Sequence, residues 1–279
     1  MRAFPHIFAS WLLFIGLTAH ASPALTSANE LKNGLQKLVN AEHRSLANKS
    51  RNKYRHPVET LTFFGLAPSM AVVEVWPGTG WYTEILAPAV KEKGRYYAAH
   101  FSPNQQGEFF ENMRTQFKQK LESDPEHYSE AVLTSLYPPG ADLSKVPAGS
   151  IDLVLTFRNV HNWTKGGFDQ EMFNAFHMML KPGGILGVVE HRALAGTSLE
   201  DMIESGYMTE AYVIGLAEKA GFKLFAKSEV NSNDKDSTQH PAGVWSLPPT
   251  LREGEKNKEK YLEIGESDRM TLKFIKIGQ

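Results

Sequence analysis

Apolar and polar positions alternate in blocks from residue 70 to the end of the chain. Short apolar runs of strand length alternate with longer stretches whose apolar residues recur at helical spacing. Strands are predicted over 70–76, 95–101, 131–137, 151–157, 184–191, 223–230 and 271–277, and helices over 81–94, 108–121, 169–180 and 209–221. Near-continuous apolar strands separated by helices are typical of parallel sheets covered on both faces. The pattern therefore predicts an α/β fold, doubly wound around a mostly parallel seven-stranded sheet.

Two more helical patterns lie ahead of the first strand. Residues 29–47 carry leucines at roughly helical spacing. Residues 57–64 open with a proline and end before Gly65, which are typical start and stop signals of a helix. We expect residues 22–69 to form an N-terminal helical cap on a domain of residues 70–279.

The first 21 residues differ from the rest of the chain. A short basic start at Arg2 is followed by an apolar run over 8–19 and by the small-residue site Ala19-His20-Ala21. This order is typical of a cleaved secretory signal peptide. An uncleaved anchor is the alternative, but the apolar run is short for one. We expect a periplasmic or secreted protein whose mature chain has no membrane span.

Composition excludes several classes of function. The chain has 30 basic and 31 acidic residues, so it lacks the positive field that nucleic acid binding requires. It has no cysteine, which rules out thiolate zinc sites, cysteine nucleophiles and disulfides. An exported domain without disulfides must be stable through its core alone, which suits a chain of 279 residues. The sequence leaves the oligomeric state open.

One segment near the end of the chain is far longer than an ordinary loop. In parallel sheets, ligands bind outside the carboxyl ends of the strands. If strand 223–230 runs parallel to the others, residues 231–269 leave and return at that edge. The segment contains His240 and Trp245, and its aromatic and proline content favours a lid over the ligand site.

The turn after the first predicted strand has a pattern typical of nucleoside binding. Glu74-x-Trp76-x-Gly78-Thr79-Gly80 is one glycine short of an acidic-x-Gly-x-Gly-x-Gly turn, because tryptophan takes the place of the first glycine. Glycine allows a ligand to approach the backbone closely. The following helix start offers free N–H groups to a carboxylate. The alternative is a purely structural strand-to-helix turn in which Trp76 simply packs. A tryptophan in an extended conformation, with its indole against the preceding helices, would leave the ligand site intact.

Three motifs in this order resemble class I S-adenosylmethionine-dependent methyltransferases. They are the glycine turn, the segment 140–157 that leads into the fourth strand, and the segment 180–190 that forms the fifth. The exported chain with PGTGWYTEILAP and GVWSLPP resembles more narrowly a group of predicted periplasmic methyltransferases. The resemblance covers about residues 70–230 and the last strand, and it implies a Rossmann-like methyltransferase fold with S-adenosyl-L-methionine as cofactor.

The resemblance also assigns cofactor contacts. They are expected from the turn (Glu74, Trp76, Gly78, Thr79 and Gly80), from His100 and Asp142, and from Arg158 and Asn159 after the fourth strand. His100 stands where the family usually has a carboxylate that binds the ribose hydroxyls. Neutral histidine accepts one hydrogen bond where a carboxylate accepts two. We expect a cofactor site with an altered contact to the ribose.

His161-Asn162-Trp163 resembles the His-Asp-Trp sequence that carries the general base in small-molecule O-methyltransferases. Histidine can remove a hydroxyl proton near neutral pH. Asn162 replaces the acid of that motif, so the sequence shows no adjacent carboxylate to orient the ring. His161 is therefore the candidate base, with a hydrogen-bonding role in the loop as the alternative.

Acceptor contacts are expected from residues gathered at the same edge of the sheet. These are Tyr54, Arg55 and His56 of the cap, Trp163, His191 and Arg192, and His240 and Trp245 of the long segment. No H-x-H or H-x-x-x-H spacing supports a metal site, and none is expected.

Three functions compete at this stage. The first is an exported methyltransferase that acts on a small-molecule or envelope acceptor, at oxygen. The second is a non-catalytic exported binding protein on a methyltransferase scaffold, which the residues at positions 76 and 100 favour. The third, a nicotinamide dehydrogenase, requires the acidic residue that is absent after the second strand.

Overall fold

The computed structural model describes residues 23–103, 105, 107–136 and 145–278, with the side chains of 23–28 left aside. One seven-stranded sheet has the order β3-β2-β1-β4-β5-β7-β6. The strands are β1 (Ala71–Val75), β2 (Arg95–His100), β3 (Val132–Ser135), β4 (Ile151–Phe157), β5 (Leu180–His191), β6 (Phe222–Ser228) and β7 (Arg269–Lys276). Only β7 pairs antiparallel, with β5 and β6. The predicted fold class is confirmed.

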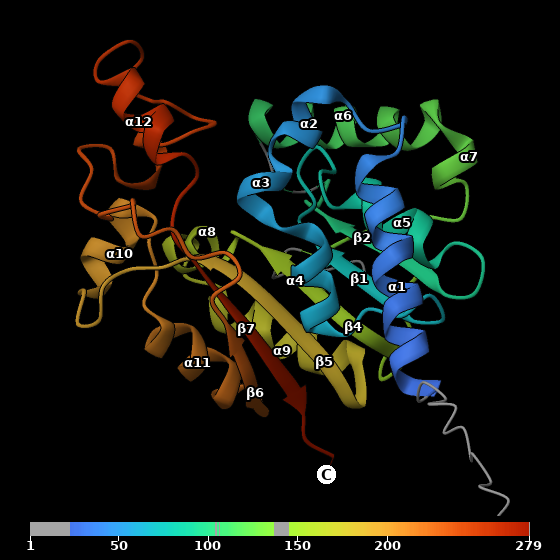
Figure 1. Ribbon diagram of the computed structural model, residues 1–279. Helices are drawn as coiled ribbons and strands as arrows, with labels where there is room; N and C mark the ends of the chain where they lie inside the picture. The colour runs from blue at the N-terminus through green and yellow to red at the C-terminus, as the bar shows by residue number, and fades with distance from the viewer. Residues whose placement is uncertain (1–22, 104, 106, 137–144, 279) are drawn as a thin grey trace, which may run out of the picture.

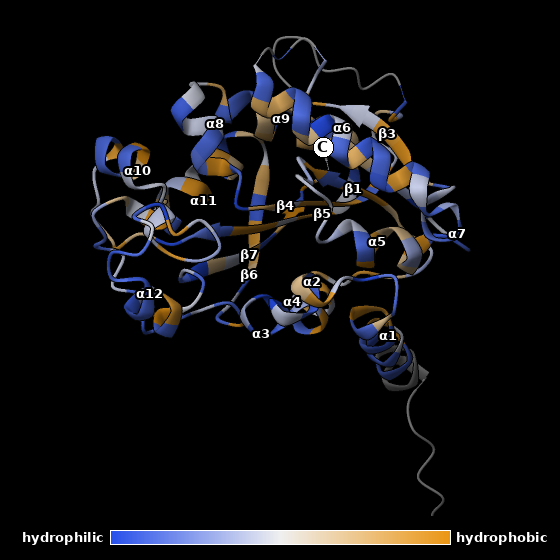
Figure 2. Cartoon of the chain, turned by 90° about the horizontal axis from the view of Figure 1, so that it is seen from above, coloured by the Kyte–Doolittle hydropathy of each residue, from blue (hydrophilic) through white to orange (hydrophobic). Residues whose placement is uncertain are grey.

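Helices cover both faces of this sheet (Figure 1). They are α1 (Pro23–Asn40), α2 (Leu46–Ser50), α3 (Asn52–Arg55), α4 (Pro57–Phe64), α5 (Thr83–Val90), α6 (Glu108–Ser123), α7 (Pro125–Tyr128), α8 (Val160–Gly166), α9 (Asp169–Met179), α10 (Leu199–Ser205), α11 (Glu210–Lys219) and α12 (Lys258–Ile264). Helices α1, α4 and α5 share one apolar core with the sheet, and α9 and α11 share the other. Figure 2 shows apolar strands at the centre and polar helix surfaces outside.

Local sequence signals account for several helix ends. Pro57 opens α4, and Gly65 ends it in the left-handed conformation with φ of 81°. Ser45, Ser198 and Thr209 cap α2, α10 and α11 by accepting hydrogen bonds from backbone N–H groups inside each helix. The cap at Ser45 starts a new helix within the stretch 29–47, which the sequence pattern had predicted as one helix.

The structure corrects two further expectations about local structure. The stretch after β4, predicted as a loop, forms the short helix α8. The charged run 252–260 contains the start of α12, which the sequence pattern did not predict as a helix, and most of its residues are exposed. Both helices are seven residues long, which is too short for a clear periodic signal in the sequence.

The segment between β6 and β7 lies at the carboxyl edge of the sheet, as predicted. Strand β6 is antiparallel to β7, which is antiparallel to β5, so β6 points the same way as the parallel strands. In Figure 1 this segment, with α12, rises above the upper edge of the sheet. Helices α2, α3 and α6 border the same edge.

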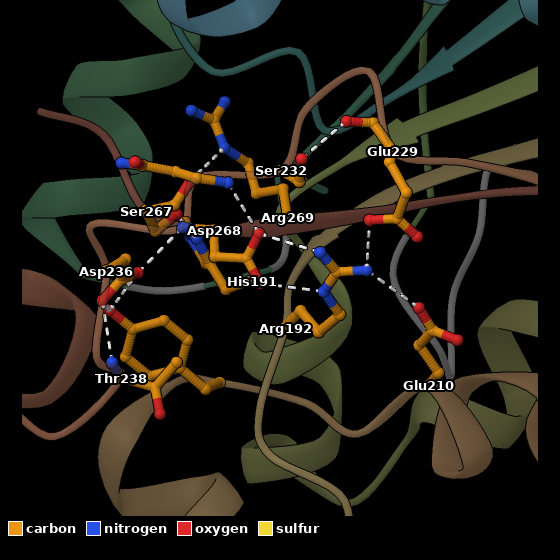
Figure 3. A network of polar contacts seen from close by, with 12 residues as sticks. His191, Arg192, Glu210, Glu229, Ser232, Asp236, Thr238, Ser267, Asp268 and Arg269 are labelled. Carbon is orange, nitrogen blue, oxygen red and sulfur yellow. Dashed lines mark hydrogen bonds and ion pairs between the residues drawn. The ribbon is translucent and has the colours of Figure 1, made fainter.

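Asp268 and Asp236 fasten the ends of this segment (Figure 3). Asp268 receives two hydrogen bonds from the Arg192 guanidinium, at 2.8 and 3.0 Å. The Asp236 carboxylate accepts from the Tyr207 hydroxyl, from His240 Nε2 and from two backbone N–H groups. These hydrogen bonds lower the pKa of Asp236, so it stays ionised.

In the described part of the chain, no helix has the length and apolar character needed to cross a bilayer. The predicted signal peptide, residues 1–21, lies outside the described residues.

Candidate functional site

Two strained residues flank the middle of the carboxyl edge. Trp76 follows β1 with φ of 49°, and Arg158 follows the neighbouring β4 with φ of 61°. Non-glycine residues rarely adopt positive φ, and each instance costs roughly 1–3 kcal/mol. Such strain persists only where the surrounding contacts enforce it, and it is common at functional sites.

The conformation of Trp76 differs from the extended one that the sequence suggested. Its indole points away from the preceding helices, toward the ends of β2 and β3. The ring Nε1 donates to the Leu136 carbonyl at 2.7 Å, and the ring packs edge-on against Phe101 and Trp163. The positive φ turns the side chain this way, which fills the space beside the turn with aromatic surface.

The two glycines of the turn have different roles. Gly80 is buried, and a Cβ there would meet Phe117 and Lys120 at 3.1 Å, so glycine is required for packing. Gly78 has φ of 61° and borders a cavity, where a Cβ would meet only the Met113 methyl at 3.4 Å. Gly78 is therefore the position where a ligand can approach the backbone, whereas the exposed Thr79 does not line this cavity.

Glu74 is a buried carboxyl group at the end of β1. Its Oε2 accepts hydrogen bonds from Thr83 Oγ1 at 2.8 Å and from the Tyr96 hydroxyl at 2.6 Å. Burial raises its pKa to about 7, because the low-dielectric interior disfavours the charged form more than these hydrogen bonds favour it. Glu74 borders the same cavity as Gly78.

His100 holds the turn from beneath and does not line that cavity. Its Nδ1 accepts from the Phe101 backbone N–H at 2.8 Å, so the proton sits on Nε2, which donates to the Gly78 carbonyl at 3.0 Å. Burial lowers its pKa to about 4, so the ring stays neutral. The expectation that His100 contacts a ribose is corrected, because both ring nitrogens already have partners. Asp142, the other residue expected near the nucleoside, lies outside the described residues.

The cavity beside the turn has a volume of about 660 Å³. Its apolar walls come from Trp76, Trp81, Tyr82, Phe101, Phe109, Phe110, Met113, Phe157 and Phe168, and its polar groups from Arg55, Glu74, Gln105, Arg158, Asn159, Asn162 and Lys165. Tyr82 and Phe157 stack at 3.6 Å between ring centroids. Among the described lining residues Glu74 is the sole acid. We call this space the turn cavity.

Asn159 joins two strands at the floor of the turn cavity. Its side-chain N–H groups donate to the Val75 carbonyl at 3.0 Å and to Thr156 Oγ1 at 3.2 Å. Asn159 and Arg158 therefore both line the turn cavity.

His161 is oriented by a carboxylate that the sequence did not reveal. Its Nδ1 lies 2.9 Å from Glu190 Oε1, at the end of β5. Glu190 is fully buried and also accepts from the backbone N–H groups of Val160 at 2.6 Å and His191 at 2.9 Å. An ionised carboxylate can only accept, so Nδ1 carries the proton and Nε2 has the free lone pair. Among the described residues, Nε2 has no hydrogen-bond partner.

Four arginines surround one carboxylate next to His161. Glu266 lies 2.6 Å from Arg51 Nε, 3.1 Å from Arg55 Nε and from Arg269 Nη2, and 3.7 Å from Arg158 Nη1. Their charges hold the pKa of Glu266 down at about 2, despite its burial. Burial and the neighbouring positive charges lower the pKa of Arg158 to about 10.

Three of these arginines, Arg51, Arg55 and Arg158, border a second cavity of about 370 Å³. It is lined by Arg51, Arg55, Phe109, Arg158, His161, His191, Val244, Trp245, Pro248, Pro249, Thr250, Glu266 and Ser267. We call it the arginine cavity. Arg55, Phe109 and Arg158 line both cavities, so the two spaces adjoin.

The structure separates the expected acceptor residues into two groups. Arg55, His191 and Trp245 line the arginine cavity, with Trp245 packed edge-on near His161 at 6.1 Å between ring centroids. Tyr54 and His56 lie in a different hollow on the far side of Glu266.

Three other expected acceptor contacts are corrected. Trp163 is 0% exposed and packs among core aromatics. Arg192 binds three carboxylates, those of Glu210, Glu229 and Asp268. His240 is bound to Asp236 within the long segment. The sequence placed these residues at the correct edge, but it does not reveal which way a side chain points.

His161, Glu190 and His191 offer nitrogen and oxygen atoms within 4.8 Å of one another. The carboxylate of this set already accepts three N–H groups, and His191 Nδ1 lies 2.5 Å from Ser267 Oγ. Burial lowers the pKa of His191 well below its usual range, as do the positive charges nearby. Each ring of this cluster therefore already has a hydrogen-bond partner: His161 is paired with Glu190 and His191 with Ser267.

Several solved structures share this fold. An S-adenosylmethionine-dependent methyltransferase from Aquifex aeolicus is 16% identical, with a TM-score of 0.55 over 88% of this chain and 98% of that one. A putative sarcosine dimethylglycine methyltransferase from Galdieria sulphuraria is 13% identical, with a TM-score of 0.56 over 84% and 88%. The [4+2]-cyclase SpnF is also 13% identical, with a TM-score of 0.56 over 89% and 94%.

No family model and no curated protein matches the chain. Identities this low establish the fold, and a fold alone does not determine an activity. The chain has the Rossmann-like methyltransferase fold, and its activity must be argued from the two cavities.

Proposed function

We propose that this protein transfers a methyl group from S-adenosyl-L-methionine to a small-molecule or envelope acceptor, at oxygen. The observation that carries the proposal is the position of His161, which is held by Glu190 and lies beside a cavity that adjoins the turn cavity. The order of motifs and the methyltransferase folds similar to this chain support the same class of reaction.

The turn cavity fits such a cofactor in size and chemistry. Its volume lies within the range of about 300–1,000 Å³ that is usual for small-molecule sites. Aromatic walls suit a purine, and the Glu74 carboxyl suits an ammonium group. At Gly78 the backbone leaves open the space that a side chain would fill. The bound cofactor would supply an electrophilic methyl group on a sulfonium.

His161 would remove the proton of the acceptor hydroxyl. Glu190 fixes the proton on Nδ1, so the lone pair of Nε2 is available, and the carboxylate stabilises the imidazolium that forms. The proton of the hydroxyl would move to Nε2 as the hydroxyl oxygen takes the methyl group, and the electron pair of the broken carbon–sulfur bond would stay on the cofactor's sulfur. The apolar side chains of Trp245, Pro248 and Pro249 limit the access of water to this point.

Turnover of labelled S-adenosylmethionine with hydroxyl acceptors tests this assignment. His161→Ala should lower turnover by roughly 10²–10⁴-fold, the usual contribution of a general base. His161→Gln should lose as much, because glutamine forms hydrogen bonds but cannot act as a base near neutral pH. The affinity for S-adenosylhomocysteine should not change in either variant.

His177→Gln is the matched control, because His177 lies on α9 and lines neither cavity. Full turnover in His161→Gln would assign His161 to the structure of the loop and contradict the proposed role.

A non-catalytic binding protein on this scaffold is the second candidate. It is favoured by His100, which is hydrogen-bonded to the Gly78 carbonyl and does not line the turn cavity. The described lining therefore has no acid at the usual ribose position. Cofactor binding without methylation of any hydroxyl acceptor would support this candidate. We also propose export to the periplasm or beyond, which rests on the N-terminal sequence.

A further inference from the structure

We propose that the arginine cavity binds an oxyanion, a carboxylate or a phosphate group, carried by the methyl acceptor. This inference rests on the proposed function for its biological meaning, but the anion site itself can be tested independently. It would place an anionic group of the acceptor beside Arg51 and Arg158, and would leave the hydroxyl near His161.

The charges around the cavity are strongly unbalanced. Arg51, Arg55 and Arg158 line the cavity with a single carboxylate, that of Glu266, so the lining carries two more positive than negative charges. Burial lowers the pKa of Arg55 well below its usual range, and its three arginine neighbours lower it further. Like charges held together in a buried site repel each other, and a bound anion relieves that repulsion.

The guanidinium groups around Glu266 also have only some of their N–H donors in hydrogen bonds. Arg51 Nε is bound to Glu266, whereas its buried Nη2 has no partner among the described residues. Arg158 reaches Glu266 only at 3.7 Å and is about a quarter exposed. A guanidinium presents several N–H donors in one plane, the geometry that suits carboxylate and phosphate oxygens. The cavity therefore offers donors as well as charge.

A metal ion is the competing occupant, since His161 and His191 border the same cavity. The two uncompensated positive charges of the lining oppose a cation and favour an anion. The one buried carboxylate of that set, Glu190, already accepts three hydrogen bonds. The electrostatics therefore select an oxyanion.

The cofactor's own carboxylate is a second competitor for these arginines. Arg55 and Arg158 line both cavities, but Arg51 lines the arginine cavity and is absent from the lining of the turn cavity. Arg51 lies between α2 and α3 and contacts Glu266. An anion site that includes Arg51 is therefore distinct from the site of the cofactor.

Isothermal titration of the mature chain with inorganic phosphate, and separately with acetate, tests the proposal. Ionic strength is kept constant with chloride, because exposed charges are screened by salt. Wild-type protein should bind at least one of the two anions, and the stronger of the two indicates whether the acceptor carries phosphate or carboxylate. Arg51→Gln and Arg158→Gln should each weaken that binding by roughly tenfold or more, since each removes a charge-assisted donor.

Arg95→Gln is the matched control, because Arg95 is exposed at the start of β2, at the opposite edge of the sheet. It should bind the anion as wild type does, and Arg51→Gln should keep its affinity for S-adenosylhomocysteine. The same titration is then repeated with S-adenosylhomocysteine bound and should give the same anion affinity.

Absence of anion binding in wild type, equal binding in Arg51→Gln, or competition with S-adenosylhomocysteine would each overturn the inference. Zn²⁺ binding that Arg51→Gln strengthens, without any anion binding, would also overturn it in favour of a cation. If the anion binds as expected but S-adenosylhomocysteine does not, the anion site stands and the proposed function falls.

Discussion

Glu74 combines burial with a position at the edge of the turn cavity. Its folded pKa of about 7 lies above the ordinary value of 4.5, so the folded protein binds this proton more tightly than the unfolded chain does. Unfolding between these two pH values releases the proton. The contribution of Glu74 to stability therefore falls as pH rises from about 4.5 to about 7 and remains low above that range.

Glu74→Gln removes this titration while keeping the size of the side chain. The difference in unfolding free energy between variant and wild type, variant minus wild type, should increase with pH. The increase should be about 1.4 kcal/mol for each pH unit between about pH 4.5 and about pH 7. Urea unfolding of both proteins at several pH values between about pH 4.5 and about pH 7, where the folded and unfolded states differ in protonation, measures the difference. Parallel profiles of the two proteins would mean that Glu74 is ionised throughout.

The sequence predicted those residues of the candidate site that lie shortly after a predicted strand. Gly78, Arg158 and His161 directly follow the first and fourth strands, so the edge on which they lie was fixed by the strand pattern. Glu190 and Glu266 were missed, because their partners lie far away along the chain: 29 residues from Glu190 to His161, and 215 from Arg51 to Glu266. A buried acid at the end of an apolar strand was the available signal for Glu190.

At the scale of elements, the segment between β6 and β7 is fastened at its ends and borders the arginine cavity in its middle. Asp236 and Asp268 receive hydrogen bonds near the two ends, and Trp245, Pro248 and Pro249 line the cavity. We infer that the ends stay fixed and that the middle closes over bound ligand.

Hydrogen exchange with and without S-adenosylhomocysteine tests this lid. Amides over 240–250 should gain protection when the ligand binds. The N–H groups of Thr238 and Asp268 should be protected in both states, because both donate to Asp236. Unchanged exchange over 240–250 would make the segment a surface insertion.

The strands were predicted more completely than the helices. Continuous apolar runs mark buried parallel strands, and all seven lie within a few residues of their predicted ranges. Helices α8 and α10 are seven residues each, so neither completes enough turns to show a period. The direction of Trp76 was unpredictable for another reason: its positive φ is enforced by tertiary contacts with Leu136 and Phe101.

At the scale of the whole molecule, the N-terminal sequence predicts a signal peptide that is cleaved after Ala21. We predict that protein purified from the cell envelope fraction starts at Ser22. Intact-mass measurement and N-terminal peptide mapping give this directly. A form that still carries Met1 would contradict the prediction of a cleaved signal peptide.

The central claim is that the turn cavity binds S-adenosylmethionine against the Gly78 backbone. Calorimetric titration of the mature chain with S-adenosylhomocysteine, in wild type and in Gly78→Val, tests it most directly. Gly149→Val is the control, since Gly149 has a similar φ of 65° and open space around it, away from both cavities. The account predicts one site in wild type and in Gly149→Val, and loss of binding in Gly78→Val with the fold retained. No binding in wild type, or undiminished affinity in Gly78→Val, would contradict it.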